Sequence, residues 1–235
     1  MKKRRKILLW ASLGLILLIV GGFYLYVSDY YRSDETALAV LDSEGVEQVS
    51  EHLIAIHPDA ESDSDTALIF YPGAKVEYTA YLPILKAIAE DADITVFLTK
   101  MPFNMAIFAA DRAADVMAAY PDIEHWYIGG HSMGGAMAGS FAEKKEDELE
   151  GMILLGAYIY GDFPPAQTLT VYGSLNTSVE EKIDYEENIV VIEGGNHAQF
   201  GNYGEQRGDA AADISQSDQQ QQAVDAIVEF IQSNK

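Results

Sequence analysis

The pattern of hydrophobic positions begins with one uninterrupted apolar run. Residues 7–27 (ILLWASLGLILLIVGGFYLYV) contain no charged side chain, and residues 2–6 before them are all Lys or Arg. At about 1.5 Å of rise per residue, a helix over this run is roughly 30 Å long, enough to cross the hydrocarbon core of a bilayer. The run therefore predicts a transmembrane helix.

A cleaved signal peptide and a buried core helix are the alternatives to a permanent anchor. A signal peptide has a shorter apolar region and a small-x-small cleavage site, whereas SDYYRSDE follows this run. The basic cluster disfavours a core helix. Because basic residues stay on the cytoplasmic side, we expect a cytoplasmic tail over residues 1–6 and a single-pass anchor in the cell membrane over residues 7–27. The rest of the chain is then extracytoplasmic.

Beyond the anchor, strand-like and helix-like patterns alternate. Residues 28–45 are polar and mixed and predict a tether, and residues 46–235 predict one folded domain. Continuous apolar runs are typical of strands buried on both faces, and apolar positions three or four apart indicate helices. The expected strands are 46–56 (one or two strands), 66–71, 93–99, 124–129, 151–155, 168–172 and 188–193, and the expected helices are 78–90, 104–120, 133–145 and 219–233. This alternation predicts an α/β domain whose mostly parallel sheet carries helices on both faces.

Composition narrows the classes of partner. The leader holds 5 of the 15 Lys and Arg and none of the 37 Asp and Glu, so the remainder carries 10 minus 37, or −27. Such a charge repels nucleic acid and anionic membrane surfaces and favours neutral or cationic small molecules, unless it serves solubility alone. The absence of cysteine excludes disulfides and thiolate chemistry. Neither metal-ligand spacing nor a nucleotide-binding motif is present, so we expect no metal and no cofactor.

The candidate chemistry centres on IGGHSMGG at residues 128–135. Ser132 stands between an expected strand and an expected helix, and Gly130 and Gly134 leave room for a sharp turn around it. The N-terminus of the following helix favours developing negative charge. The segment predicts a nucleophile elbow, and the alternative is a glycine-rich turn without chemistry.

A serine hydroxyl needs a base within hydrogen-bond reach before it attacks. Among the five histidines, His197 follows the last expected strand and so emerges at the same edge of the sheet as Ser132. His131 flanks the serine and is expected to point away from it. His197 is therefore the candidate base.

This order of nucleophile, acid and histidine resembles the α/β-hydrolase fold family over about residues 46–233. Five segments are similar to a small bacterial subgroup whose members are often membrane-anchored or exported: YPGAKV at 71–76, MPFNMAIF at 101–108, GGHSMGGAMA at 129–138, VYGS at 171–174 and GGNHAQFGNYGEQRGD at 194–209. The resemblance implies an oxyanion hole made of two backbone N–H groups. Met133 matches one position, and Ala74 matches the other, with Gly73 as its neighbouring alternative.

The third member of the triad departs from the family pattern. An aspartate usually follows in Gly-Ser-x-Asp, but this chain reads GSLN, which places Asn176 there. An amide can orient the imidazole but cannot stabilise the imidazolium by charge, and in serine proteases the same exchange lowers kcat by about 10⁴. Three possibilities stay open: Asp162, after strand 151–155, supplies the carboxylate, Asn176 serves in a slow enzyme, or the site only binds ligand.

The sequence therefore predicts a serine hydrolase that cleaves a small-molecule carboxylic ester through an acyl-enzyme. About eleven residues, 157–167, occupy the connection where lids are commonly inserted, so we expect a minimal lid and a small or polar acyl group. A silent binding domain and an acyltransferase acting on a cell-surface acceptor are the alternatives. The pattern sets no oligomeric state.

Overall fold

The chain forms two compact units, Met1–Tyr30 and Tyr31–Lys235, in a computed structural model that describes residues 2–58, 62 and 64–234. The first unit is the helix α1 (Lys2–Ser28). Among the described residues, one helix is long and apolar enough to cross a membrane, namely α1 over Lys3–Ser28. The helix agrees with the predicted transmembrane segment in length and composition, and its role as a membrane anchor stays a prediction.

The second unit is built on an eight-stranded sheet with the order β1-β2-β4-β3-β5-β6-β7-β8. The strands are β1 (Val46–Ser50), β2 (Leu53–Ile56), β3 (Thr66–Tyr71), β4 (Thr95–Thr99), β5 (His125–His131), β6 (Gly151–Leu155), β7 (Thr168–Gly173) and β8 (Ile189–Ile192). β2 pairs antiparallel with β1 and β4, and the remaining neighbours pair in parallel. The predicted mostly parallel sheet is confirmed.

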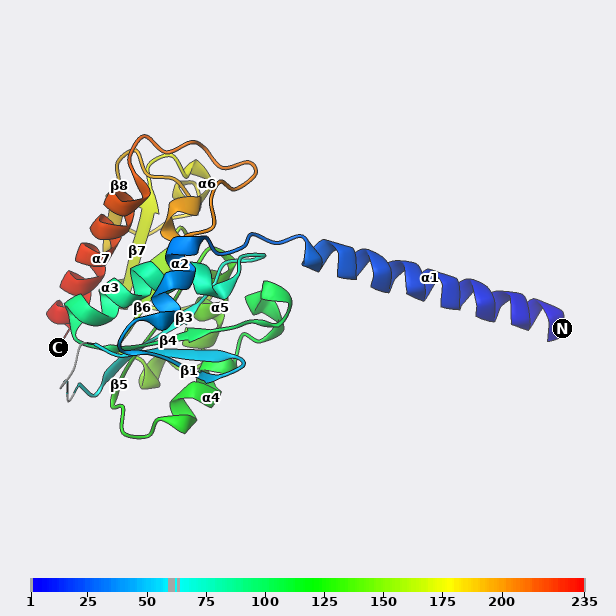
Figure 1. The fold of residues 1–235 in the computed structure, drawn as a ribbon, viewed down its shortest axis with the longest axis horizontal. Coiled ribbons are helices and arrows are strands. Elements are labelled where there is room, and N and C mark those ends of the chain that lie inside the picture. Colours follow the sequence, from blue (N-terminus) through cyan, green and yellow to red (C-terminus); the bar gives the residue numbers. More distant parts are fainter. Residues whose placement is uncertain (1, 59–61, 63, 235) are drawn as a thin grey trace. The chain divides into compact units, whose positions relative to one another are not determined.

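Helices cover both faces of this sheet, as Figure 1 shows. The helices of this unit are α2 (Glu35–Ala39), α3 (Leu82–Ala92), α4 (Arg112–Ala119), α5 (Met133–Ala142), α6 (Thr177–Glu180) and α7 (Gln216–Ser233). One buried apolar cluster joins the sheet to α3 and α7, and a second joins it to α4 and α5. Because both faces are covered, every residue of β3 and β4 is buried, which explains their continuous apolar runs.

The expected helix over residues 104–120 forms only in its second half, as α4 (Arg112–Ala119). Before it, Phe103 and Asn104 have φ values of 56° and 53°. Residues other than glycine rarely adopt this left-handed backbone conformation, which interrupts a right-handed helix. Residues 102–108 therefore form two short 3₁₀ turns, Pro102–Asn104 and Ala106–Phe108.

Residues 31–45 also differ from the expected tether, because they pack on the domain. Tyr31 forms a parallel bridge with Val76. α2 follows with Asp34 as its N-cap, and Ala37 in that helix is fully buried. Composition did not reveal these contacts, whose partners lie more than 40 residues further along the chain.

Candidate active site

Ser132 lies at the sharp turn between β5 and α5. Its φ and ψ are 54° and −122°, a strained conformation for any residue with a side chain. The turn is held by neighbouring backbone, since Ser132 N–H donates to Leu155 O at 3.0 Å and Ser132 O accepts from Ala136 N at 3.1 Å. This sharp turn from strand to helix has the geometry expected of a nucleophile elbow.

Gly130 and Gly134 are the positions where this turn has no room for a side chain. A Cβ on Gly134 would overlap the carbonyl oxygen of Tyr71, and one on Gly130 would overlap the backbone of Gly134. Both obstacles are backbone atoms, which cannot rotate aside as the end of a flexible side chain can. The two glycines therefore allow β5, α5 and the end of β3 to meet closely.

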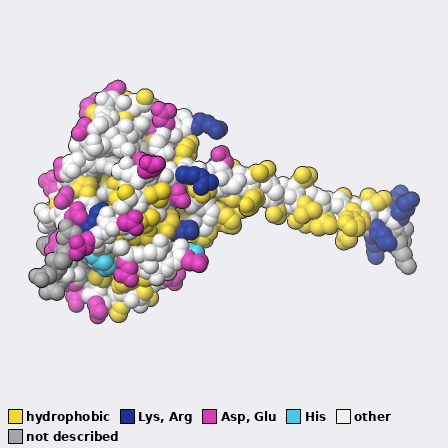
Figure 2. Space-filling model, in the orientation of Figure 1, with side chains coloured by type: hydrophobic (Ala, Val, Ile, Leu, Met, Phe, Trp, Pro, Cys, Tyr) yellow, Lys and Arg dark blue, Asp and Glu magenta, His cyan; other side chains and the backbone are white. Residues whose placement is uncertain are grey.

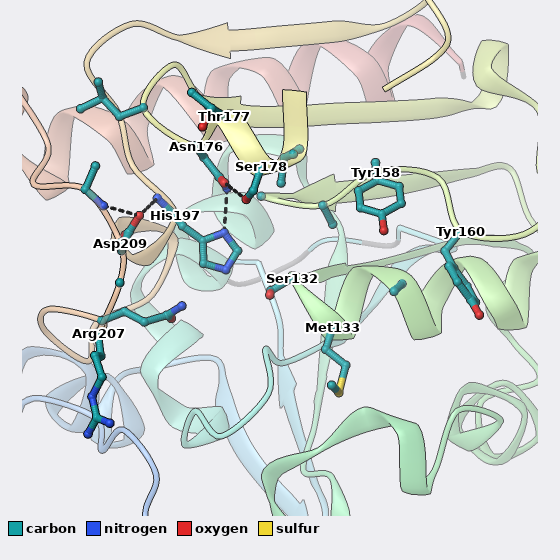
Figure 3. Close-up of a pocket in the computed structure, with 18 of the residues that line it drawn as sticks. Ser132, Met133, Tyr158, Tyr160, Asn176, Thr177, Ser178, His197, Arg207 and Asp209 are labelled. Atoms are coloured by element: carbon teal, nitrogen blue, oxygen red, sulfur yellow. Dashed lines mark hydrogen bonds between the residues drawn. The ribbon is translucent and has the colours of Figure 1, made fainter. Parts of the chain in front are cut away.

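The ring of His197 lies between Ser132 and Asn176 in Figure 3. Asn176, which follows β7, places its Nδ2 2.7 Å from His197 Nδ1, and its Oδ1 accepts from Ser178 Oγ at 2.9 Å. Asn176 is only 5% exposed. Of the two candidates for the third position, Asn176 is the one that the structure brings to the histidine.

The amide of Asn176 has two orientations that keep both hydrogen bonds, because the hydroxyl of Ser178 both donates and accepts. In one, the amide nitrogen donates to Nδ1 of His197, and the ring proton is then on Nε2. In the other, the amide oxygen accepts from Nδ1–H, which leaves a free lone pair on Nε2. Only the second orientation equips His197 to take a proton from Ser132.

Asp162, the other candidate, is exposed in the turn after β6. The described carboxylate that contacts His197 belongs instead to Asp209. Its two oxygens accept from His197 N–H at 3.2 Å and from Ala198 N–H at 2.7 Å. Burial lowers the pKa of His197, and the Asp209 carboxylate acts against this by raising it. A negative charge therefore lies close to the histidine without a described hydrogen bond to its ring.

His131 connects three loops of the site from a fully buried position. Its Nδ1 lies 2.8 Å from Tyr81 Oη, its Nε2 lies 3.0 Å from His197 O, and Gly73 N–H donates to Tyr81 Oη at 3.1 Å. The carbonyl oxygen of His197 only accepts, so Nε2 of His131 carries a proton. Burial holds the pKa of His131 well below its usual value, so the ring is neutral and its Nδ1 accepts from the hydroxyl of Tyr81.

This network also separates the candidates for the oxyanion hole. The N–H of Gly73 is engaged with Tyr81. Among the described residues, no backbone acceptor takes the N–H of Ala74, and Met133, as the first residue of α5, has no acceptor within its helix. Ala74 and Met133 thus keep N–H groups that have no hydrogen-bond acceptor in the described part of the chain.

A cavity of about 870 Å³ lies over Ser132 and His197, and its wall also includes Met133, Asn176, Arg207 and Asp209. Its volume is within the range of small-molecule sites. The connection from β6 to β7 contributes Tyr158 and Tyr160 to the wall, and its shortness leaves the site with a minimal lid. In Figure 3 the labelled side chains come from several loops around Ser132.

A separate cluster lies at the opposite ends of the strands. Asp65, Glu124 and His125 bring one ligand atom each within 4.8 Å of one another, and all three are exposed. His125 Nδ1 lies 2.8 Å from Glu150 Oε1, a hydrogen bond that raises the pKa of His125. None of these residues lines the cavity over Ser132.

Comparison with known proteins bears on the fold. Residues 67–221 match the model of a family described as the alpha/beta hydrolase family. A search of curated proteins finds no relative of similar sequence.

Similar solved structures include carboxyl esterase 2 from the mycorrhizal fungus Tuber melanosporum, with a TM-score of 0.58 and 9% identity over 88% of this chain and 92% of that one. An esterase from the archaeon Pyrobaculum calidifontis has a TM-score of 0.56 and 11% identity over 85% and 90% of the two chains. A hormone-sensitive lipase from a metagenome library has a TM-score of 0.55 and 12% identity over 86% and 92%. At these identities the likeness is one of architecture.

Proposed function

This chain belongs to the alpha/beta hydrolase family, and from that premise we propose that it is a serine hydrolase that cleaves a carboxylic ester through an acyl-enzyme. The observation that carries the proposal is the strained Ser132 at the end of β5, with the ring of His197 beside it. The available N–H groups of Ala74 and Met133 support it. The esterases and lipases of similar architecture agree with an ester substrate.

In the proposed reaction, Nε2 of His197 takes the proton of Ser132 as Oγ attacks the ester carbonyl. The carbonyl oxygen becomes an oxyanion that accepts from the N–H groups of Ala74 and Met133, an interaction worth several kcal/mol in related enzymes. The ester C–O bond then breaks, and His197 gives its proton to the departing alcohol. Water, deprotonated by His197, attacks the acyl-enzyme and releases the acid, and Ser132 recovers its proton.

We propose that Asn176 orients His197 and that Asp209 supplies part of the missing charge. Asn176 contacts the ring nitrogen Nδ1 of His197, whereas Asp209 accepts a hydrogen bond from the backbone N–H of His197. An amide leaves the imidazolium without a hydrogen-bonded counter-charge, so the proposed enzyme is slow compared with one that has aspartate at position 176. Asp162 has no role in this scheme.

The proposed substrate carries a small or polar acyl group, because the site has a minimal lid. The proposed reaction uses side chains, backbone N–H groups and water, and it needs no metal or cofactor. We further propose that α1 anchors the protein in the cell membrane, with the domain on the extracytoplasmic side.

The test combines a fluorophosphonate probe with a panel of p-nitrophenyl esters. The parent should be labelled and should hydrolyse short-chain esters, and Ser132→Ala should lose both. Ser140→Ala, which changes a serine on the same helix α5, is the matched control and should keep both. Equal labelling and hydrolysis by the parent and Ser132→Ala would refute the serine mechanism.

Asparagine at position 176 favours a second candidate, a domain that binds an ester without turning it over. In that case the parent gives neither labelling nor hydrolysis, although it still binds ligand. Acyl transfer to a cell-surface acceptor shares the acyl-enzyme with hydrolysis. Adding alcohol acceptors and measuring transesterified product separates transfer from hydrolysis.

A further inference from the structure

The chain enters the domain beside the loop that provides the proposed oxyanion hole. Tyr31 N–H donates to Lys75 O at 2.7 Å, and Glu77 N–H donates to Tyr31 O at 2.9 Å. The phenol oxygen of Tyr31 accepts from Arg207 N–H at 2.9 Å. Lys75 directly follows Ala74, and Arg207 lines the cavity. Tyr31 is therefore held at the active-site edge of the sheet.

The residues after Tyr31 continue to pack on the domain. Ser33 Oγ lies 2.6 Å from Thr79 Oγ1, and Asp34 N–H donates to Asn202 O at 2.9 Å. Ala37 in α2 is fully buried. The part of the expected tether that lies outside the domain is thus reduced from residues 28–45 to residues 28–30.

This short connection limits how the domain can face a membrane. From residue 27 to residue 31 the chain makes four Cα steps, which reach at most roughly 14 Å. The domain Tyr31–Lys235 has 235 minus 30, or 205, residues, and such a domain has a radius of gyration of about 17 Å, or roughly 40 Å across. If residues 7–27 span the bilayer, the edge at Tyr31 stays near the lipid surface and the opposite edge cannot reach it.

The same edge carries a group of exposed apolar side chains, which we call the apolar rim: Phe103, Ile107 and Phe108. They are 51%, 55% and 49% exposed. Lys75 N–H donates to Asn104 O at 2.7 Å, so the segment that bears the rim is bonded to the loop that holds Tyr31. Ile107 also lines the cavity over Ser132. The rim therefore joins the site of chain entry to the mouth of the cavity.

The rim is unusual for this domain in both hydrophobicity and charge. Among its described residues, seven large hydrophobic side chains are exposed, and three of them form the rim: Leu38, Val49, Phe103, Ile107, Phe108, Tyr160 and Val191. The segment 101–110 has no charged residue, whereas Asp and Glu are spread over the face of the domain seen in Figure 2. An anionic lipid surface repels the rest of the domain more strongly than it repels this segment.

We propose that the apolar rim docks into the headgroup region of the membrane that carries α1, and that the substrate is an amphiphilic ester held in that lipid surface. Exposed aromatic and aliphatic side chains bury themselves at this depth of a bilayer. The apolar part of the substrate stays in the bilayer while its ester and its small or polar acyl group enter the open cavity. The substrate claim rests on the proposed function, whereas the docking does not.

Docking is tested on the full chain in phosphatidylcholine vesicles that contain brominated lipid. Because the chain has no cysteine, a single introduced cysteine is the only site for a fluorescent label. Phe108→Cys places the label on the rim, and Asp122→Cys, exposed at the amino end of β5, is the matched control. Brominated lipid should quench the label at position 108 and not the one at position 122. Equal quenching at the two positions, or none at position 108, overturns the docking.

The substrate class is tested with a rim variant, Phe103→Ser with Phe108→Ser, and with Val191→Ser as a control for removing exposed apolar surface on β8. The rim variant should keep its rate on soluble p-nitrophenyl acetate and lose at least about fivefold on an ester of a long-chain alcohol held in vesicles. The control Val191→Ser should keep its rate on both substrates. Equal effects on the two substrates overturn the substrate class. A parent that is inactive on both overturns the proposed function, and the quenching result is unaffected.

Discussion

Replacing Asn176 by aspartate is expected to raise kcat. In the parent, the amide of Asn176 lies 2.7 Å from His197 Nδ1 and 2.9 Å from Ser178 Oγ, and only one of its two orientations leaves Nε2 of His197 free to accept a proton. A carboxylate accepts from both partners at once, so His197 carries its proton on Nδ1 in every molecule and presents Nε2 to Ser132. The carboxylate also stabilises the imidazolium that forms during the reaction.

The size of the gain follows from the charge and from its burial. Unit charges about 4 Å apart interact by about 4 kcal/mol at an effective dielectric constant of 20, which is about 10³ in rate. Position 176 is nearly buried, at 5% exposure, and burying a carboxylate offsets part of this. We therefore expect a rise between about 10-fold and 10³-fold, below the 10⁴ of the serine proteases.

The assay is kcat and kcat/KM on a p-nitrophenyl ester as a function of pH. The reaction needs neutral His197, so activity falls as the pH drops through its pKa. In the parent, burial lowers this pKa, and the new carboxylate raises it, which moves the acidic limb of kcat/KM to higher pH. Asn188→Asp, the same exchange at the amino end of β8, is the control and should change neither quantity. An unchanged kcat with an unmoved acidic limb would refute the role of Asn176.

Three further predictions follow from the same contacts. Asp209→Asn should lower kcat by about 10-fold and move the acidic limb to lower pH, because this carboxylate raises the pKa of His197, whereas Asp213→Asn in the same loop should do neither. Tyr81→Phe removes the hydroxyl that bonds His131 and should cost about 1–3 kcal/mol of unfolding free energy in urea titrations, and an unchanged midpoint would contradict the network. Burial lowers the pKa of both His131 and His197, so each ring binds more protons in the unfolded chain. The unfolding free energy should therefore be highest above about pH 6.5. At lower pH it should decrease by at most about 1.4 kcal/mol per pH unit for each histidine. A flat profile between pH 8 and pH 5 would show that these rings are not held neutral.

The sheet was predictable from the sequence because its central strands, such as β3 and β4, are buried on both faces and therefore read as continuous apolar runs. The predictions that were wrong depended on backbone geometry and on contacts between residues far apart in the sequence. An alanine-rich pattern over residues 104–120 did not reveal that Phe103 and Asn104 adopt positive φ. The polar composition of residues 28–45 did not reveal that Tyr31 pairs with Val76.

Ser132 and His197 were placed correctly at one edge of the sheet, since each follows a strand that the apolar pattern located. The choice between Asp162 and Asn176 depended on how two loops fold back, which no spacing rule encodes. Asp209 was missed although it ends the segment GGNHAQFGNYGEQRGD. It lies twelve positions after His197, and only the folded loop brings its carboxylate to the backbone of that histidine.

The buried link from Gly73 through Tyr81 and His131 to the carbonyl of His197 has a consequence for how the site is lost on heating. Three loops share these hydrogen bonds, so none of them opens without breaking bonds to the others. The amide of Gly73 should then exchange with deuterium only through unfolding of the whole domain, as slowly as the amides of the central strands. Thermal inactivation would coincide with the end of the folded state and would have no earlier stage of local loosening.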